Sequence, residues 1–323
     1  MIRRTWRDRI GRSAAEARST RVSRYSPAVN PAVLLSCHGS VDDLGDLPAF
    51  LQNIGRGRPP KPEVLAEVTR RYRHIGGSPL MRTTVAQAAA LEQRLGVPVR
   101  IAGRLWRPYP AEVVAELAAA GVDALVSLPL APQSVHVYHP PVREAAAAHG
   151  VRVAEVPSWG LEPALVEAFL ETIAEAEATL AAPAPVVLTA HSLPLRVIAG
   201  GDPYERDFRT MAERVAAGLA AQGIPSRIAF QSQGMSGDSW LGPDLPQTFA
   251  ALVAEGTRTV VVAPIGFLAD HVETLYDLDV EAPALAAQAG IERLVRAPAV
   301  NVRPRFVDAL EAVARRGLES LAG

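Results

Sequence analysis

Pro31-Ala-Val-Leu-Leu-Ser-Cys-His38 and Pro185-Val-Val-Leu-Thr-Ala-His191 are two short apolar stretches that each begin at a proline and end at a histidine. Each is rich in aliphatic residues and too short for a typical helix, so each predicts a buried strand. Stretches rich in Ala, Leu and Glu with helical periodicity follow them, and this alternation predicts βαβ units with parallel sheets. The two stretches indicate that one folding unit occurs twice in the chain.

Three further pairs of segments recur in the same order in the two halves. The pairs are Gly96-Val-Pro-Val-Arg-Ile-Ala102 with Gly223-Ile-Pro-Ser-Arg-Ile-Ala229, Pro129 to His136 with Pro264 to His271, and Gly150 to Pro157 with Gly290 to Pro298. Four ordered matches predict an α/β fold of two similar Rossmann-like lobes, each a parallel β-sheet flanked by helices. We expect the strand-end histidines to meet at one site, because ligands of such sheets bind beyond the carboxyl ends of the strands.

The expected domain boundaries follow from this repeat and from local composition. We expect a first lobe at 31–158 and a second at 159–323, with the last helix, about 303–323, packing back on the first lobe. Residues 1–30 contain eight arginines, one aspartate and one glutamate, which predicts a basic, disordered tail. A mis-assigned start and an Arg-rich transit peptide are the alternative interpretations of this segment.

The overall composition excludes several classes of protein. The 323 residues are 49% hydrophobic and carry a formal net charge of −1, so no global field attracts nucleic acid or an anionic membrane. The longest apolar runs fall short of the roughly 20 residues of a membrane-spanning helix, and no signal peptide opens the chain, which favours a cytoplasmic protein. A single cysteine, Cys37, excludes an internal disulfide and a four-cysteine iron–sulfur cluster.

An acidic segment follows one of the repeated histidines. Glu273, Asp277 and Glu281 are spaced four residues apart, so a helix would align them as a ridge on one face, ending near Pro283. A solvated acidic face is the ordinary interpretation of such a run. No lysine or arginine balances it between positions 270 and 291, which favours a path for a divalent cation or for protons.

Two other features suggest a site for a metal and an anionic ligand. His191 ends its apolar stretch where Ser192-Leu-Pro194 turns the chain away from the predicted sheet. A structural histidine is the alternative, but its repeat counterpart His38 and the nearby acidic segment favour a functional one. The segment Arg56-Gly-Arg58-Pro-Pro60 sets two guanidinium groups on a stiff loop, which suits the capture of carboxylates.

Several motifs together resemble the signature regions of ferrochelatases, over about residues 31–320. In the second half they are Leu188-Thr-Ala-His-Ser-Leu-Pro194, Gly201-Asp-Pro-Tyr204, Gln231-Ser232 with Trp240-Leu-Gly-Pro-Asp244, and Pro264-Ile-Gly-Phe-Leu-Ala-Asp-His-Val-Glu-Thr-Leu-Tyr-Asp277. In the first half they are Asn53-Ile-Gly-Arg-Gly-Arg-Pro-Pro60, Arg71-Tyr-Arg-His-Ile-Gly-Gly-Ser-Pro-Leu80 and Leu128-Pro-Leu-Ala-Pro132.

The resemblance implies a two-lobed chelatase that inserts Fe²⁺ into a porphyrin in haem biosynthesis, with no organic cofactor and with Fe²⁺ as a substrate. It places His191 and Glu273 at the porphyrin centre as catalytic and metal-binding residues, with Asp277 and Glu281 continuing outward as metal ligands. The residues expected to bind the porphyrin are His38, Arg56, Arg71, Tyr72 and Ser78. His38 departs from the family pattern, because soluble relatives have a tyrosine there.

The expected chemistry fits these side chains. Two pyrrole N–H protons must leave before iron enters, and a site that bends the macrocycle exposes the nitrogen lone pairs. Imidazole near neutral pH is suited to accept protons, and imidazole with carboxylate suits ferrous iron. We assign His191 as proton acceptor and Glu273 as iron ligand or proton partner, and the reverse division stays open.

Two other functions remain as alternatives. A cobalt or nickel chelatase for sirohydrochlorin is one, because Cys37-His-Gly-Ser40 is similar to that group, and a non-catalytic haem carrier is the other. Between porphyrins we favour coproporphyrin III over protoporphyrin IX, because Gly234-Met-Ser-Gly-Asp-Ser-Trp240 resembles the soluble coproporphyrin branch. The expected partners are the porphyrin, Fe²⁺ and, transiently, neighbouring enzymes of the haem pathway, with no nucleic acid.

Overall fold

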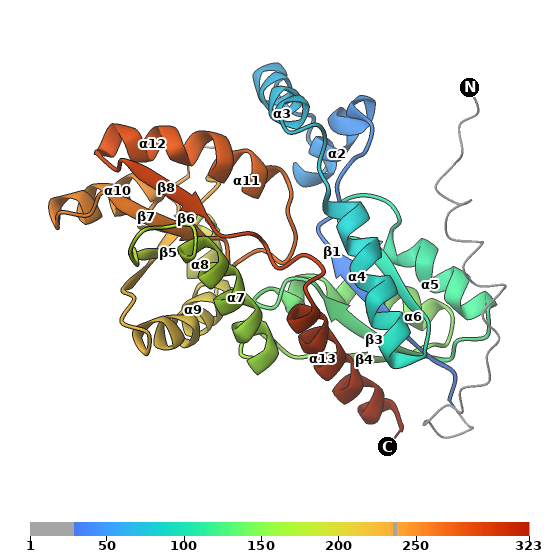
Figure 1. Cartoon of the computed structure of the whole chain (residues 1–323). Coiled ribbons are helices and arrows are strands. Elements are labelled where there is room, and N and C mark those ends of the chain that lie inside the picture. The colour runs from blue at the N-terminus through green and yellow to red at the C-terminus, as the bar shows by residue number, and fades with distance from the viewer. Residues whose placement is uncertain (1–28, 235–237, 323) are drawn as a thin grey trace.

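The computed structural model describes residues 29–234 and 238–322, and in them the chain forms two parallel four-stranded sheets (Figure 1). The strand order is β2-β1-β3-β4 in the first sheet and β6-β5-β7-β8 in the second. Corresponding strands thus hold corresponding places, which confirms the predicted pair of Rossmann-like lobes. The strands are β1 (Pro31–Cys37), β2 (Val99–Gly103), β3 (Ala124–Pro129), β4 (Arg152–Glu155), β5 (Val186–His191), β6 (Ser226–Gln231), β7 (Thr259–Ala263) and β8 (Arg293–Arg296).

Helices connect the strands on both faces of each sheet. They are α2 (Leu47–Ile54), α3 (Pro62–His74), α4 (Leu80–Leu95), α5 (Pro110–Ala119), α6 (His139–Ala148), α7 (Pro163–Glu177), α8 (Leu195–Ala199), α9 (Tyr204–Ala220), α10 (Leu245–Ala254), α11 (Val272–Leu275), α12 (Ala282–Ala289) and α13 (Pro304–Ala322). Two 3₁₀ turns, η1 (Leu44–Asp46) and η2 (Val135–Val137), and a π-helical turn, η3 (Asp277–Glu281), complete them.

Local sequence explains where many of these helices begin and end. Proline lies in the first turn of α2, α3, α5, α6, α7, α10 and α12, where its missing N–H would have no helical partner in any case. Helix α4 ends at Gly96, whose φ of 72° is left-handed and whose N–H donates to the Glu92 carbonyl. A glycine adopts this conformation without the steric cost of a Cβ, so the chain can turn directly into β2.

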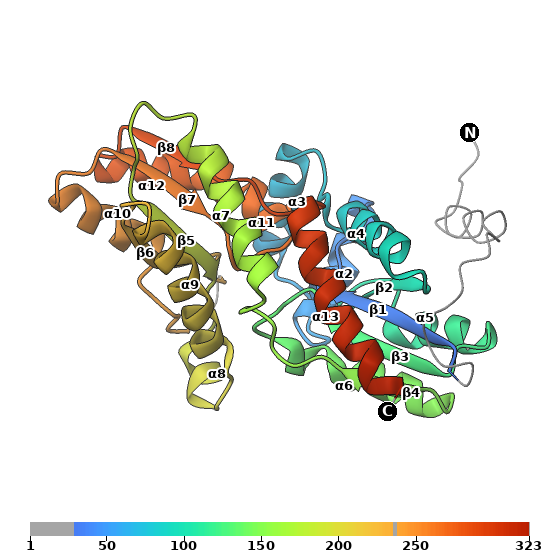
Figure 2. The same cartoon turned by 60° about the horizontal axis from the view of Figure 1, so that its bottom comes forward.

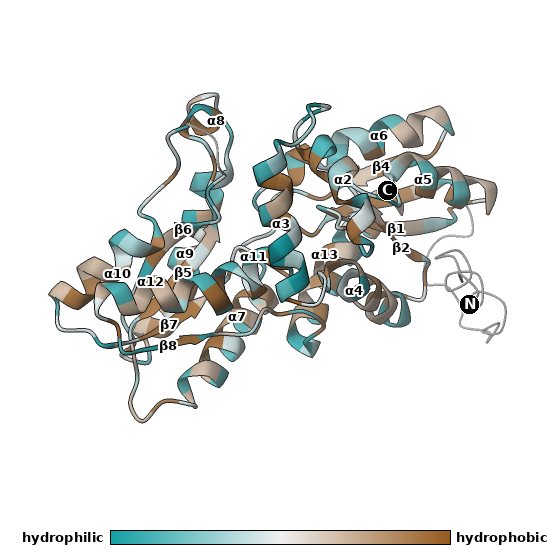
Figure 3. Ribbon diagram, turned by 90° about the horizontal axis from the view of Figure 1, so that it is seen from above, coloured by the Kyte–Doolittle hydropathy of each residue, from teal (hydrophilic) through white to brown (hydrophobic). Residues whose placement is uncertain are grey.

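One hydrophobic core joins the two lobes. It contains Leu35 and Val126 of the first sheet and Leu188 and Phe230 of the second, and Figure 3 shows hydrophobic segments, coloured brown, in both lobes. Strands β1 and β3 are buried along their whole length, because parallel sheets are covered by helices on both faces. The predicted boundary between residues 158 and 159 stays a prediction, since the core is continuous across it.

Helix α13 contacts β3, β4 and α4 of the first lobe as well as α7, and Figure 2 shows it lying across the first sheet beside α7. Its Phe306 stacks on Trp159, with ring centroids 6.5 Å apart, and the Trp159 indole N–H donates to the Pro129 carbonyl. Apart from residues 29 and 30, the predicted basic tail lies outside the described residues. Among the described helices, none has the length and apolar character needed to cross a membrane.

Candidate active site

The candidate site lies beyond the carboxyl ends of equivalent strands in the two lobes. His38 follows β1 directly, and His191 is the last residue of β5. These strands occupy the same position in the two sheet orders, and Glu273, His271 and His191 lie close enough to His38 to influence its pKa. The structure thus brings together strand ends that are far apart in the sequence, as parallel topology favours.

The strand end that carries His191 is held in place by Tyr204. The Tyr204 hydroxyl donates to the His191 carbonyl oxygen over 2.8 Å, and its buried ring stacks on Phe208 with centroids 6.5 Å apart. The backbone N–H of Tyr204 in turn donates to the Asp202 carboxylate over 2.9 Å. The Gly201-Asp-Pro-Tyr204 motif therefore has a local structural role beside His191.

The Glu273 carboxylate lies between two imidazole rings. Its Oε1 is 3.5 Å from His191 Nε2, and its Oε2 is 3.6 Å from His271 Nε2. Both distances exceed the range of an ordinary hydrogen bond, about 2.7–3.2 Å. The Gln231 side-chain N–H₂ donates to the Glu273 carbonyl over 2.9 Å and so fixes the backbone that carries the carboxylate.

The hydrogen bonding of His271 determines which of its ring nitrogens faces Glu273 with a lone pair. Its Nδ1 is 3.2 Å from the Ala269 carbonyl oxygen, so we assign the ring hydrogen to Nδ1. A neutral His271 then presents a lone pair from Nε2 to the Glu273 carboxylate. The contact is attractive only when a proton or a metal cation lies between the two groups. Within residues 29–234 and 238–322, no group of three or more His, Cys, Asp or Glu side chains forms a preformed metal site.

Glu273 and His38 differ in charge at neutral pH. Burial raises the pKa of Glu273, but the electrostatic influence of the two neighbouring imidazoles, His191 first and then His271, outweighs it and lowers this pKa to about 2. His38 has an exposed side chain, yet protein surrounds it closely, and this desolvation, aided by His271, His191 and Arg104, lowers its pKa below the usual value although Glu273 opposes the shift. Glu273 is therefore anionic, whereas the His38 imidazole is neutral.

The acidic ridge differs in form from the helix that the sequence predicts. Glu273 lies in the short helix α11, while Asp277 and Glu281 bound the π-helical turn η3, so the three do not share one regular α-helix. The expectation that Pro283 ends the helix is wrong. Pro283 lies instead in the first turn of α12, where a proline needs no N–H partner.

Asp277, the first residue of the π-helical turn η3, is buried. Burial, more than any other influence, raises its pKa to about 6, although the Ser232 hydroxyl, which donates to Oδ2 over 2.5 Å, and the charge of Arg71 oppose the shift. Ser232 has a φ of 59°, which is uncommon for a residue with a side chain. Neither Gln231 nor Ser232 was among the predicted site residues, although both belong to a motif that the sequence singled out.

The residues predicted to bind a porphyrin fall into two groups. The Tyr72 hydroxyl is buried 3.1 Å from the Ser40 hydroxyl and near Glu273, and Arg71 forms ion pairs with Asp277 and Glu281, so both belong to the site. Ser78 accepts a hydrogen bond from the Leu80 N–H at the start of α4, and Arg56 is exposed in the turn after α2. Among the described residues, no hydrogen bond or ion pair joins these last two to the site.

Arg104 and His271 are site residues that the prediction omitted. Arg104 follows β2, lies with its guanidinium 5.9 Å from the centre of the Tyr138 ring, and forms no ion pair within the described part of the chain. His271 carried a signal in the sequence, because the spacing from Pro264 to His271 repeats that from Pro129 to His136. Arg104 had no comparable signal, since only the fold brings the end of β2 beside His38.

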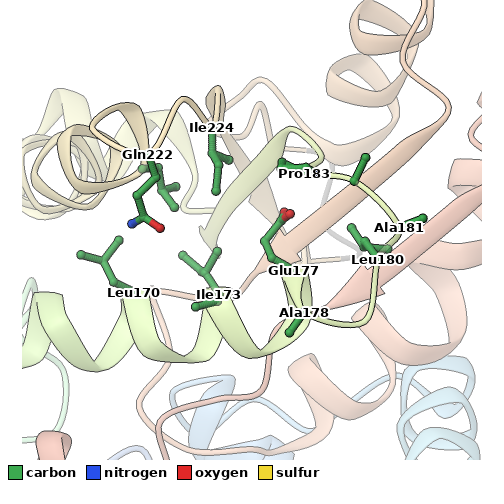
Figure 4. A pocket seen from close by; sticks show the side chains of 12 residues that line it. Leu170, Ile173, Glu177, Ala178, Leu180, Ala181, Pro183, Gln222 and Ile224 are labelled. Atoms are coloured by element: carbon green, nitrogen blue, oxygen red, sulfur yellow. The ribbon is translucent and has the colours of Figure 1, made fainter.

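A separate pocket of about 330 Å³ lies at the C-terminal end of α7. Figure 4 shows Leu170, Ile173 and Glu177 along one side of it, with Gln222 and Ile224 opposite. Its lining includes none of the predicted site residues. This pocket therefore belongs to the packing of α7 against the end of α9 and not to the site.

Solved chelatase structures have the same arrangement of lobes. SirB from Bacillus subtilis with Fe³⁺ matches with a TM-score of 0.58 at 14% identity, over 91% of this chain and 97% of SirB. DR2241 from Deinococcus radiodurans, a multi-domain protein with structural similarity to chelatases, matches with a TM-score of 0.54 at 16% identity, over 89% of this chain and 55% of that one. The fold is that of the chelatase class.

Sequence comparison narrows this class. A model of the ferrochelatase family matches residues 30–318. The ferrochelatase of Acidobacterium capsulatum is 37% identical over 90% of this chain and 95% of its own length, and the coproporphyrin III ferrochelatase of Bacillus subtilis is 32% identical over 88% and 97%. The chain belongs to the ferrochelatase family, and the prediction of a ferrochelatase, a lyase, is confirmed at this level.

The close approach of the loop after β7 to strand β5 can be tested directly. A Cβ at Gly266, on the loop from β7 to Glu273, would lie 2.5 Å from Ala190 Cβ and 2.7 Å from Ala190 Cα. We expect Gly266→Ala to lower the free energy of unfolding in urea by about 1–3 kcal/mol, the usual cost of overpacking. Adding Ala190→Gly should remove the shorter of the two contacts, that with Ala190 Cβ, so the double variant should lose less than the sum of the single variants. Additive losses would contradict this account.

Proposed function

We propose that this protein inserts Fe²⁺ into a porphyrin at the site formed by His191 and Glu273, with release of two protons. The observation that carries the proposal is a carboxylate whose two oxygens face two imidazoles beyond the strand ends. Imidazole nitrogen and carboxylate oxygen both suit ferrous iron, and the pyrrole nitrogens of a porphyrin would supply the remaining donor atoms. In the overall step four Fe–N bonds form, two pyrrole N–H bonds break, and two protons leave, so charge balances.

The electrostatics of the pair support a division of roles. Glu273, with a pKa of about 2, is a weak proton acceptor near neutral pH and keeps its negative charge to attract Fe²⁺. His191 faces the same space and carries an imidazole, the group best suited to take a pyrrole proton near neutral pH. We therefore assign proton acceptance to His191 and iron binding to Glu273.

Asp277 and Glu281 support a supply route for the metal. They follow Glu273 along the chain and bring two further carboxylates towards the outside of the lobe, where the Glu281 side chain is 38% exposed. Hard divalent cations prefer oxygen ligands of this kind. We propose that Fe²⁺ reaches Glu273 along this acidic path.

We further propose coproporphyrin III as the preferred porphyrin. Coproporphyrin carries two more propionates than protoporphyrin, and Arg104, which lies near His38, lacks a carboxylate partner among the described residues. Several relatives at 30–33% identity are named coproporphyrin III ferrochelatases, including those of Bacillus subtilis and Bacillus pumilus. A guanidinium without a partner would pair with one of the additional propionates.

The first prediction concerns the central pair. His191→Ala and Glu273→Gln should each lower kcat for iron insertion by about 100-fold or more, the scale of losing a positioned acid–base group. Anaerobic assays with Fe²⁺ and porphyrin measure the rates, and thermal unfolding shows that each variant is folded. Near-normal turnover by either variant would remove that residue from the mechanism, and absence of turnover by the wild type would favour a haem carrier.

The second prediction concerns the porphyrin. Arg104→Ala should weaken binding of coproporphyrin III by about tenfold or more, as expected when one charge-assisted hydrogen bond is lost, and should weaken protoporphyrin IX less. Fluorescence titration measures both affinities. Arg107→Ala is the matched control, because Arg107 is 71% exposed and already pairs with Glu112. Equal losses for the two porphyrins would argue against Arg104 as the selective residue.

The third prediction concerns His38. Its neutral imidazole lies edge-on to Phe50 and near Glu273, so it can bind iron in the haem product as an axial ligand. His38→Tyr should then shift the visible spectrum of the enzyme–haem complex while leaving porphyrin affinity nearly unchanged. An unaltered spectrum in both His38→Tyr and His38→Ala would show that His38 does not contact the metal.

A further inference from the structure

Arg71 connects the two lobes through a set of ionic contacts. It belongs to α3 of the first lobe, and its Nη1 and Nη2 donate to Asp277 Oδ1 and Glu281 Oε1 of the second, each over 2.8 Å. Its guanidinium also lies 4.9 Å from the centre of the Tyr276 ring. The Arg71 guanidinium therefore occupies the two carboxylates that we propose as the supply route for Fe²⁺.

This arrangement sets two expected roles of Arg71 against each other. A guanidinium that bridges Asp277 and Glu281 cannot at the same time use those N–H groups to hold a porphyrin propionate. The two carboxylates, for their part, cannot bind a divalent cation while they are hydrogen-bonded to a positive side chain, because like charges repel. Arg71 must therefore release the two carboxylates before it can bind a propionate, and it must release the propionate before it can pair with them again.

We propose that Arg71 exchanges between the Asp277–Glu281 pair and a porphyrin carboxylate, so that porphyrin binding frees the acidic pair to take up a divalent cation. The inference rests on the proposed function and adds an order of events to it. By thermodynamic linkage, the porphyrin and the metal then favour each other's binding, although the metal does not touch the propionate.

The contacts around Arg71 suit such an exchange. The Arg71 Nε donates to Glu67, one turn earlier on the same helix, over 2.7 Å, and this bond can persist while Nη1 and Nη2 change partners. The Arg71 and Glu281 side chains are 26% and 38% exposed, so solvent screens their ion pair and its loss costs little. The Asp277 side chain is only 7% exposed, but it keeps the hydrogen bond from the Ser232 hydroxyl when Arg71 leaves. A propionate would restore charge-assisted hydrogen bonds of the same kind.

The neighbouring Arg70 provides a matched control. Its guanidinium pairs with Glu67 and lies 5.1 Å from the centre of the Tyr276 ring, close to the same acidic turn. No hydrogen bond or ion pair joins it to Asp277 or Glu281 in the described residues. Arg70→Gln therefore removes the same charge from the same helix without releasing the two carboxylates.

The first experiment measures Co²⁺ binding to the porphyrin-free protein by its visible absorption. Arg71→Gln should bind Co²⁺ about fivefold more tightly than wild type, the scale of a partly exposed ion pair, whereas Arg70→Gln should stay close to wild type. Adding Glu281→Gln to Arg71→Gln should abolish the gain. Thermal unfolding checks the fold, and Arg71→Lys, which keeps the charge, should bind Co²⁺ nearly as weakly as wild type.

The second experiment measures coproporphyrin III affinity with EDTA present, so that no metal takes part. Glu281→Gln should raise the affinity by about threefold in the wild-type background, because it removes a competitor for Arg71. The same substitution should have no effect in the Arg71→Gln background. Such a difference between backgrounds is the coupling that exchange requires.

The results separate this inference from the proposed function. Equal Co²⁺ affinity in wild type and Arg71→Gln, or an equal effect of Glu281→Gln in both backgrounds, would overturn the exchange even if the wild type inserts iron normally. Neither binding experiment depends on turnover. Failure of iron insertion by the wild type, with the coupling intact, would instead overturn the proposed reaction.

Discussion

His191 and His271 face the two oxygens of the Glu273 carboxylate and lower its pKa, so that it stays ionised. The surrounding structure fixes the relative positions of these three groups. Tyr204 holds the carbonyl of His191, and Gln231 holds the carbonyl of Glu273. Both supports are hydrogen bonds to backbone, so they fix the positions of the side chains without occupying their functional atoms. A partly buried carboxylate without such neighbours would take up a proton more readily and lose its attraction for a cation.

The shared hydrophobic core keeps the two lobes, and with them these groups, in fixed relative positions. Equivalent lobes joined only by a linker would move relative to one another, and the distance between His38 and His191 would vary with them. Here residues of both sheets, together with α7 and α13, form one packed cluster. The site therefore lies on two rigid sheet edges, whereas the residues that cross between the lobes at the surface, such as Arg71, are partly exposed and held by ionic contacts that are easier to exchange.

The π-helical turn η3, Asp277–Glu281, carries one buried and one partly exposed carboxylate. Asp277 is nearly buried, and its pKa is raised by that burial, while Glu281 remains partly exposed. The π-helical geometry of Asp277–Glu281 turns these carboxylates towards Arg71 and Ser232, which a regular α-helix with the same sequence would align differently. Irregular helical turns are common at functional sites, and this one joins α11, which carries Glu273, to α12.

The sequence by itself determined the repeat, the parallel sheets, the family and the placement of His191 at a strand end, because these follow from local periodicity and from motifs of adjacent residues. It did not determine that a π-helical turn would interrupt the acidic ridge or that Pro283 would begin a helix. Nor did it indicate that Arg71 would pair with Asp277 and Glu281, about two hundred residues away. Such ion pairs depend on how the lobes pack, and only the tertiary structure sets the distance between charges on separate lobes.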